Sequence, residues 1–368
     1  MIWEPERLDD QQHLSEGDPG GMLLAVAASA AQVRTGHRTA VEAGVERLAE
    51  WGRPRSVVVT GMGGSAIAGD MLAAVCGNGV PLPLMTVRSH RLPGWVGAAD
   101  LVIAVSCSGR TEETLSAATE AVRRGCALLA VGSPGSPLES LARQASAIYV
   151  PVPASGQPRA NVWLLTIPLI VAAASLGLTR ADQALFESVA GVLEDIAHRC
   201  RPSSESFVNP GKALATELAE SLPMIWGSSP LAAVAGYRLA CQLNENAKYP
   251  AVFGELPEAD HNQVVAFDGP FARRDIFADT PARTLRLVML RDTDEHPQVA
   301  RRREASERIA QDRDVPVTEL AAEGEHPLER LASLVGLGDY ASTYLALGYG
   351  VDPTPVTAIA ELKARISQ

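Results

Sequence analysis

The fold is decided by the stretch Ser56–Asp70, whose sequence is SVVVTGMGGSAIAGD. Its β-branched run, Val57–Thr60, predicts a buried strand, and the glycines that follow allow a tight turn close to a ligand. We expect Ser65 to cap a helix over Ala66–Ala74, whose unpaired N–H groups and dipole favour an anion. Strand, glycine turn and helix together predict a phosphate-binding unit.

The glycine turn differs from the common nucleotide-binding loops. It fits only the looser dinucleotide form, ending in Ala66, and no Asp or Glu closes the next strand to hold a ribose. It also lacks the lysine of a Walker loop. The sequence therefore disfavours a dinucleotide.

Composition limits the partners that the chain could bind. Its 368 residues allow two domains or one pseudo-symmetric pair, and 46% hydrophobic with 20% charged residues is typical of a soluble protein with a large core. The net charge of −11, without a Lys/Arg run interleaved with aromatic residues, argues against nucleic acid. An anionic ligand must therefore be held locally, by amides and hydroxyls.

Cysteine usage and hydropathy indicate a cytoplasmic protein. The 5 cysteines form no C-x-x-C pair, which favours reduced thiols over disulfides. The residues after Met1 have neither the basic nor the apolar region of a signal peptide. The apolar stretch Val162–Leu178 contains Pro168 and is short for a membrane span, so we expect a core helix and no membrane contact.

Strands alternate with helices along the chain, which predicts α/β architecture with a mainly parallel, doubly wound sheet. Ligands of such sheets bind beyond the carboxyl ends of the strands. A second donor-rich turn, Ser106–Thr111, takes that position before a helix that runs to Gly125. Ser and Thr there are more often simple helix caps, but two such turns at neighbouring strand ends favour phosphate. The strands expected in this half are Val57–Thr60, Pro83–Val87, Leu101–Val105, Ala127–Val131 and Ile148–Val150.

The second half begins like the first. The strand Met224–Trp226 precedes Gly227, two serines and a helix from Leu231 to about Asn246, an offset of 227 − 61 = 166 residues from the first glycine turn. We interpret this as a degenerate second copy of one fold. Its other expected strands are Leu285–Leu290 and Val315–Leu320.

The remaining segments connect these two copies. Residues 1–20 are polar and predict a loosely held leader, and residues 21–51 have helical spacing interrupted near Gly36. Residues 160–221 predict almost continuous helix, broken at Pro168, Thr179 and Pro202. The predicted division is 1–50 (leader and helix), 51–155 (first domain), 156–208 (helical bridge), 209–347 (second domain) and 348–368 (C-terminal helix).

Two residues of the second half are candidates for chemistry. Glu245 ends an apolar helix between Asn244 and Asn246, and a carboxylate held rigidly there could act as a general base, although a lone Glu is usually a solvated charge. His261 lies in a polar loop, where a lone histidine is more often a surface residue. No other histidine nearby offers metal-ligand spacing, so we expect no metal.

Six motifs occur in an order that resembles the bifunctional phosphoglucose/phosphomannose isomerase family. That family is built from two sugar-isomerase (SIS) domains, and the resemblance runs from about residue 20 to the C-terminus. The motifs are Gly61–Ser65 (GMGGS), Ser106–Thr114 (SCSGRTEET), Gly156–Arg159 (GQPR), Asn244–Lys248 (NENAK), Glu258–Asn262 (EADHN) and Gly350–Val356 (GVDPTPV).

The resemblance implies a role for each motif residue in a hexose 6-phosphate isomerase without a cofactor. Glu245 would move a proton between C1 and C2, Arg159 would stabilise the enediolate, and Lys363 would assist ring opening or bind hydroxyls. His261 would open the sugar ring in the neighbouring subunit of a homodimer. The residues that would hold the phosphate are Gly63, Gly64, Ser65, Ser106, Ser108 and Thr111.

The family pattern is not matched everywhere, and two other functions fit the same pocket. The family commonly has Tyr, Asn, Asn and Glu where Cys107, Arg110, Asp260 and Gln263 stand, which leaves the substrate open. The choice between glucose and mannose depends on the room for rotation about C2–C3, which the sequence does not decide. A non-catalytic sugar-phosphate sensor would need only the phosphate site, and a keto-sugar-processing enzyme of specialised metabolism would share all of it. The joint presence of the four implied catalytic residues favours an isomerase.

Overall fold

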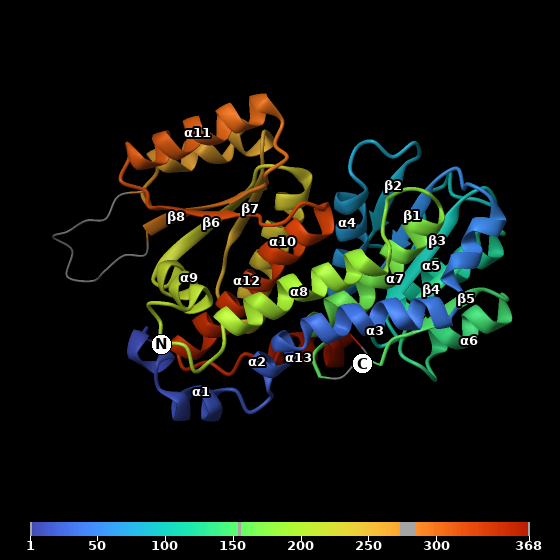
Figure 1. Ribbon diagram of the computed structural model, residues 1–368, viewed down its shortest axis with the longest axis horizontal. Coiled ribbons are helices and arrows are strands. Elements are labelled where there is room, and N and C mark those ends of the chain that lie inside the picture. The colour runs from blue at the N-terminus through green and yellow to red at the C-terminus, as the bar shows by residue number, and fades with distance from the viewer. Residues whose placement is uncertain (1, 154–155, 273–283, 367–368) are drawn as a thin grey trace. The chain divides into compact units, whose positions relative to one another are not determined.

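The structure is a computed structural model that describes residues 2–153, 156–272 and 284–366 (Figure 1). The chain divides into two compact units, each built around one parallel sheet. The first-sheet unit comprises Ala27–Glu194 and Pro327–Glu329, and the second-sheet unit comprises Met1–Val26, Asp195–His326 and Arg330–Gln368. The five-part division predicted from the sequence rests on composition and motifs, and it stays a prediction.

The first sheet has the strand order β2-β1-β3-β4-β5, and all neighbouring strands are parallel. Every strand expected in this half is present, and each end lies within one residue of its predicted position. This order brings β1 next to β3 at the point where the sheet changes winding direction, so the turns after both strands lie side by side. The strands are β1 (Val57–Thr60), β2 (Leu84–Val87), β3 (Leu101–Ser106), β4 (Ala127–Gly132) and β5 (Ile148–Pro151).

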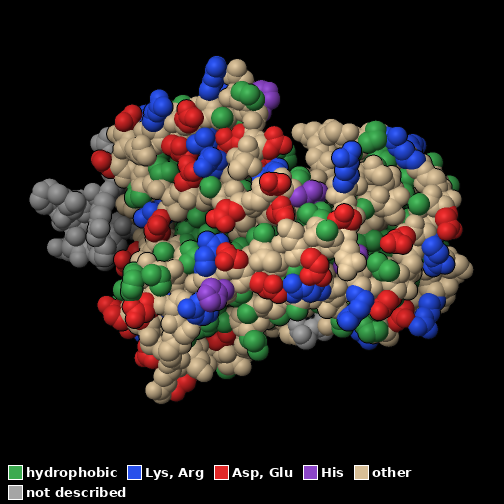
Figure 2. Space-filling model, viewed as in Figure 1, with side chains coloured by type: hydrophobic (Ala, Val, Ile, Leu, Met, Phe, Trp, Pro, Cys, Tyr) green, Lys and Arg blue, Asp and Glu red, His purple; other side chains and the backbone are tan. Residues whose placement is uncertain are grey.

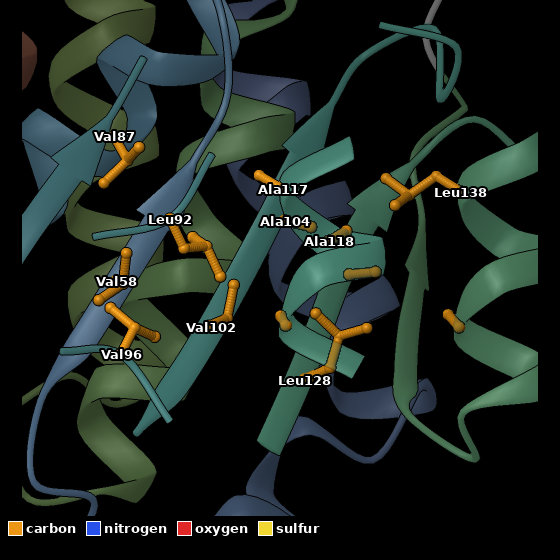
Figure 3. Close-up of a cluster of buried hydrophobic side chains, with 13 residues drawn as sticks. Val58, Val87, Leu92, Val96, Val102, Ala104, Ala117, Ala118, Leu128 and Leu138 are labelled. Atoms are coloured by element: carbon orange, nitrogen blue, oxygen red, sulfur yellow. The ribbon is translucent and has the colours of Figure 1, made fainter. Parts of the chain in front are cut away.

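Helices cover both faces of this sheet. On one face α5 (Glu112–Arg123) and α6 (Pro137–Gln144) pack over alternate strand residues, which include Val58 and Val102 (Figure 3). On the other face lie α3 (Ser29–Glu42), α4 (Gly64–Cys76) and α7 (Val162–Ser175). The buried faces of the strands explain their continuous apolar runs.

The second sheet repeats the order of the first, as β7-β6-β8-β9 with parallel pairs throughout. Figure 1 shows α10 (Pro230–Asn246) and α11 (Pro297–Gln311) on opposite faces of this sheet. Among the described residues the sheet has no counterpart of β5. The sequence analysis missed β7, a short edge strand that contains Gly254. The strands are β6 (Ser221–Gly227), β7 (Val252–Glu255), β8 (Thr284–Arg291) and β9 (Val317–Ala321).

The N-terminal residues are packed, so the prediction of a loose leader was wrong. Residues 2–17 form a short 3-10 helix, Pro5–Leu8, and the helix α1 (Gln11–Gly17), with Leu8 and Leu14 buried. His13 Nε2 lies 3.0 Å from the carbonyl oxygen of Leu347. The ring of Trp3 packs on Tyr349 at 5.2 Å between centroids. The local sequence of this segment is mostly polar, and the residues that it packs against lie near the other end of the chain. The packing could therefore not be predicted from the segment alone.

Two predicted helix interruptions were also wrong. The helix α7 runs through Pro168, and α3 runs through Gly36. Gly36 allows the two helices to approach, because a Cβ there would lie 3.1 Å from Cβ of Ile167. The apolar segment Pro158–Ser175 is long enough to cross a membrane, but 83% of it is buried inside the structure, as expected for a core helix.

The other predicted breaks, near Thr179 and Pro202, fall in the gaps that separate α7, α8 and α9. The remaining helices are α2 (Met22–Ala27), η2 (Val45–Trp51), η3 (Pro158–Asn161), α8 (Gln183–Arg199), α9 (Pro210–Leu218), η4 (Glu258–His261), η5 (Gln263–Asp268), α12 (Pro327–Gly348) and α13 (Thr357–Ile366).

Candidate functional site

At the turn between β1 and α4, the backbone at Gly61 packs directly against the backbone of β3 and of the first turn of α4. A Cβ on Gly61 would lie 3.0 Å from the carbonyl oxygen of Val105 on the neighbouring strand and 3.1 Å from the nitrogen of Ala66. Gly63 has φ +54°, a left-handed conformation that favours glycine. The glycines are therefore required by the shape of the turn, as well as by access to a ligand.

Ser65 does not cap the helix, contrary to our expectation. The N-cap of α4 is Gly63, which makes no side-chain cap hydrogen bond, and Ser65 lies inside the first turn. Its hydroxyl oxygen accepts a hydrogen bond of 3.2 Å from the backbone N–H of Cys107. Ser65 therefore joins the glycine turn to the hydroxyl-rich turn that follows β3.

The hydroxyls of the second turn are not simple helix caps either. Thr111 is the N-cap of α5 but makes no side-chain cap bond. Its Oγ1 instead accepts from the buried Oγ of Ser106 at 3.0 Å. The Oγ of Ser108, an exposed residue, accepts from the N–H of Arg110 at 3.2 Å, which leaves its own hydrogen available to donate.

The two turns together present donors to one region. In the described part of the chain no acceptor is bonded to the N–H of Gly63 or of Gly64, and Gly63 is exposed. The positive ends of the α4 and α5 dipoles meet at the same place, since β1 and β3 are neighbours. We name this region, formed by residues 61–65 and 106–111, the phosphate cradle, because its geometry suits a small anion.

Arg159 lies beside the phosphate cradle. It is on η3 and is 4% exposed, with Nη1 donating to Oε1 of Gln157 at 3.1 Å. Its Cα is 3.7 Å from the position that a Cβ on Gly64 would take. Positive and negative side chains are interspersed on the face of the molecule drawn in Figure 2. In a chain of net charge −11, the buried Arg159 is therefore a local source of positive charge beside the phosphate cradle.

Glu245 is the last residue but one of α10, and that helix is anchored to α12 by buried polar side chains. Asn246 Nδ2 donates to Ser342 Oγ at 3.0 Å, so this neighbour of Glu245 is buried and bonded to α12, whereas Asn244 is exposed. Gln242 Nε2 and Arg238 Nη2 donate to the two carboxylate oxygens of Asp339, at 3.0 and 2.7 Å. The half-buried Glu245 therefore sits at the end of a rigid helix.

His261 is exposed at the end of η4, between two anchored residues. Asp260 accepts a hydrogen bond of 2.7 Å from Ser306 Oγ on α11. Gln263 accepts from Trp226 Nε1 at 2.7 Å and donates to the carbonyl of Phe253 at 2.9 Å, a pair of roles that a glutamate could not fill. The residues at these two departures from the family pattern therefore hold the loop, while the imidazole faces outward.

The predicted site residues fall into two groups. The phosphate cradle and Arg159 belong to the first-sheet unit, and Glu245, His261 and Lys363 belong to the second-sheet unit. Lys363 is on α13, a helix without a buried residue among those described.

Burial raises the pKa of the Cys107 thiol to about 11, so the cysteine at this departure from the family pattern is a neutral side chain at pH 7. Residues 2–153, 156–272 and 284–366 contain no cluster of three acidic, His or Cys side chains suited to a metal.

The second sheet has a corresponding pair of turns, but their donors are already used. Asp292 follows β8, the counterpart of β3, and Ser229 follows β6. Ser229 Oγ donates to Asp292 Oδ2 at 2.8 Å, and Arg330 Nε donates to Oδ1 at 2.7 Å. The Asp292 N–H itself donates to Ser228 Oγ at 3.0 Å. Sequence reasoning missed this buried carboxylate, for which the only signal was an acid directly after a strand.

Comparisons with known proteins agree with this description. Residues 207–366 match the family model of the bacterial phospho-glucose isomerase C-terminal SIS domain. The chain is 35% identical over 312 residues to a bifunctional phosphoglucose/phosphomannose isomerase of Caldicellulosiruptor bescii, covering 85% of this chain and 89% of the relative. A protein of the same description from Aquifex aeolicus is 32% identical over 315 residues, with 85% and 91% covered. The fold is similar to that of a hypothetical protein of Thermus thermophilus, with TM-score 0.73, 16% identity, and 99% and 94% covered.

The buried carboxylate of the second sheet gives a stability prediction. Asp292 and Arg330 have side chains only 3% and 8% exposed, so Asp292→Asn leaves a buried guanidinium without its counter-charge. We expect the free energy of unfolding to fall by about 3 kcal/mol, measured by urea denaturation. The matched control is Asp294→Asn, because Asp294 is 87% exposed and 4.0 Å from the same arginine. Its effect should stay within about 0.5 kcal/mol, and equal effects of the two variants would contradict the prediction.

Proposed function

This chain belongs to the bifunctional phosphoglucose/phosphomannose isomerase family, and on that premise we propose that it interconverts glucose 6-phosphate, mannose 6-phosphate or both with fructose 6-phosphate. The observation that carries the proposal is the phosphate cradle, in which the hydrogen bond from Cys107 N–H to Ser65 joins two donor-rich turns beside Arg159. Amide and hydroxyl donors at two helix starts suit the dianionic phosphate of a sugar. Phosphate binding far from the reacting carbons supplies energy for positioning them.

The chemistry that we assign to the remaining residues is a proton transfer between C1 and C2. After His261 or Lys363 has helped to open the ring, the Glu245 carboxylate takes the proton from C2 of the aldose, and the C1 carbonyl oxygen gains the negative charge of an enediolate. Arg159 stabilises that charge. A proton then passes from the C2 hydroxyl to the C1 oxygen, and the same carboxyl group returns a proton to C1, which leaves a hydroxyl at C1 and a carbonyl at C2. The sequence of steps is balanced without a metal or a redox cofactor.

The anchoring of α10 supports catalysis over simple binding. A sensor of sugar phosphates requires the phosphate cradle alone. Here Arg238, Gln242 and Asn246 fix the helix that carries Glu245, and this is the arrangement that a general base needs. The following experiments separate the two functions.

Ser108 tests phosphate binding. Ser108→Ala removes one hydroxyl donor from the phosphate cradle and leaves the backbone of the turn unchanged, so we expect the Kd for fructose 6-phosphate to rise about tenfold. Isothermal titration measures the Kd, and kcat should stay within about twofold because the reacting carbons are not touched. Ser116→Ala, an exposed serine on α5, is the matched control. An unchanged Kd for Ser108→Ala would place the phosphate elsewhere.

Glu245 tests proton transfer. Glu245→Gln keeps the shape of the side chain but cannot accept a proton, so we expect kcat to fall by a factor of about a hundred to ten thousand while the Kd changes little. Deuterium exchange from solvent into C2, followed by NMR, should fall in parallel. Glu304→Gln, which alters a half-exposed carboxylate on α11, should leave both rates unchanged. A wild type that binds hexose phosphates but neither isomerises them nor exchanges the C2 proton would instead be a sensor.

We further propose a homodimer in which His261 serves the partner's site. Variants of His261 and Glu245 test this assembly. The exposed side chains of Val265 and Phe271, which follow His261 in the chain, support an interface on this surface. Glu245→Gln and His261→Gln are each expected to be inactive alone. After mixing and reassociation, half of the dimers are hybrids with one intact site of two, so activity should recover to about a quarter of wild type. No recovery, with hybrids verified by mass spectrometry, would refute action across the interface.

A further inference from the structure

Lys248 occupies a backbone conformation that normally belongs to glycine. It is the residue after the C-cap of α10, Ala247, and its φ is +55°. The N–H of Tyr249 donates to the carbonyl of Leu243 at 3.0 Å, so the chain turns back onto the last turn of α10 directly after this left-handed residue. A glycine would adopt this conformation with less strain, and Ser146, Glu220 and Asp314 also carry a side chain in it, so the contribution of the lysine is judged from the contacts of its ammonium group.

Lys248 is an exposed residue, and its ammonium group contacts four backbone carbonyl oxygens from two segments. Two belong to the end of α10, at 3.1 Å from Nζ to the oxygen of Glu245 and 3.1 Å to that of Asn246. The other two belong to Asp352 at 3.0 Å and Pro353 at 3.4 Å. A cation suits the negative end of a helix dipole, and here it also binds a segment 104 residues further along the chain.

The second segment leads directly into α13, the helix that carries Lys363. Asp352 Oδ1 accepts from the N–H of Thr354 at 2.9 Å, which fixes the turn before α13. Gly20 packs on Thr354 so closely that a Cβ at Gly20 would lie 2.2 Å from Oγ1. The α13 helix buries no side chain among the described residues, and this turn connects it to the end of α12.

We propose that Lys248 is a positioning residue, whose ammonium ties the end of the helix that carries Glu245 to the turn that places Lys363. This inference rests on the proposed function, because it assigns Lys248 to the spacing of two groups of the isomerase reaction. A lysine that only capped the helix would affect stability and would leave turnover unchanged. The distinction is therefore measurable.

The decisive variant is Lys248→Gly, which removes the ammonium and also relieves the left-handed strain. Its matched control is Asp314→Gly, since Asp314 has φ +61° in the same unit and lies outside the proposed site. Asp314→Gly should raise the thermal midpoint by about 1 to 2 °C and leave kcat unchanged. Lys248→Gly should gain less in midpoint, because it loses the carbonyl contacts together with the strain.

We expect Lys248→Gly to lower kcat by a factor of about ten to a hundred, with KM within about twofold, because misplaced catalytic groups slow the reaction without weakening phosphate binding. Lys248→Arg, which keeps the charge, should recover part of the loss. Hydrogen exchange measured by mass spectrometry should become faster in residues 350–356 of Lys248→Gly and stay unchanged in Asp314→Gly.

Three results would overturn the proposal. Unchanged exchange in residues 350–356 would show that the tie does not hold the turn, whether or not the protein is an isomerase. Faster exchange with kcat equal to wild type would show a tie without a positioning role. A wild type that isomerises no hexose phosphate would remove the proposed function, and the positioning role with it, while the exchange data still decide whether the tie exists.

Discussion

The phosphate cradle depends on the close approach of two backbones at Gly61. The carbonyl of Val105 and the first turn of α4 leave no room there for a side chain, and this contact sets how near the two strand-end turns can lie. At this spacing the N–H of Cys107 donates to the Ser65 hydroxyl at 3.2 Å. Gly227 meets the same constraint in the second sheet, where a Cβ would lie 2.2 Å from the nitrogen of Ala233. Packing thus dictates the same glycine in both copies, whatever each copy binds.

The two copies differ more in the polar groups of their strand-end turns than in their architecture. Both sheets have the same strand order up to the fourth strand, and both follow the central strand with glycine and serine. In the first, donors remain open at Gly63 and Ser108. In the second, Asp292 takes the donors of Ser229 and Arg330 and fills the position with an internal carboxylate.

The features that depend on a local sequence pattern were predicted correctly. The strands of both sheets except β7, and the two donor-rich turns, followed from β-branched runs and from glycine and serine positions. Prediction from the sequence failed for residues whose contact partners are distant in the chain. Ser65 has the composition of a helix cap, but its hydroxyl bonds Cys107, 42 residues away. Pro168 suggested a break, yet α7 is buried on all sides between α3 and α4, and tertiary packing keeps it continuous. Asp292 belonged to no motif, because its role depends on Arg330, 38 residues later.

The division of the chain into units has a consequence for how the protein is made. The first-sheet unit consists of residues 27–194 and the short segment Pro327–Glu329, so most of it is synthesised as one contiguous stretch, whereas the second-sheet unit combines residues before 27 with the segments after 194. His13 meets Leu347 across 334 residues, which a ribosome synthesising about 5 to 20 residues per second takes roughly 20 s to one minute to make. During that interval Leu8 and Leu14 lack the core that later buries them. Leu8 and Leu14 therefore stay accessible to chaperones and proteases until the end of α12 has been synthesised.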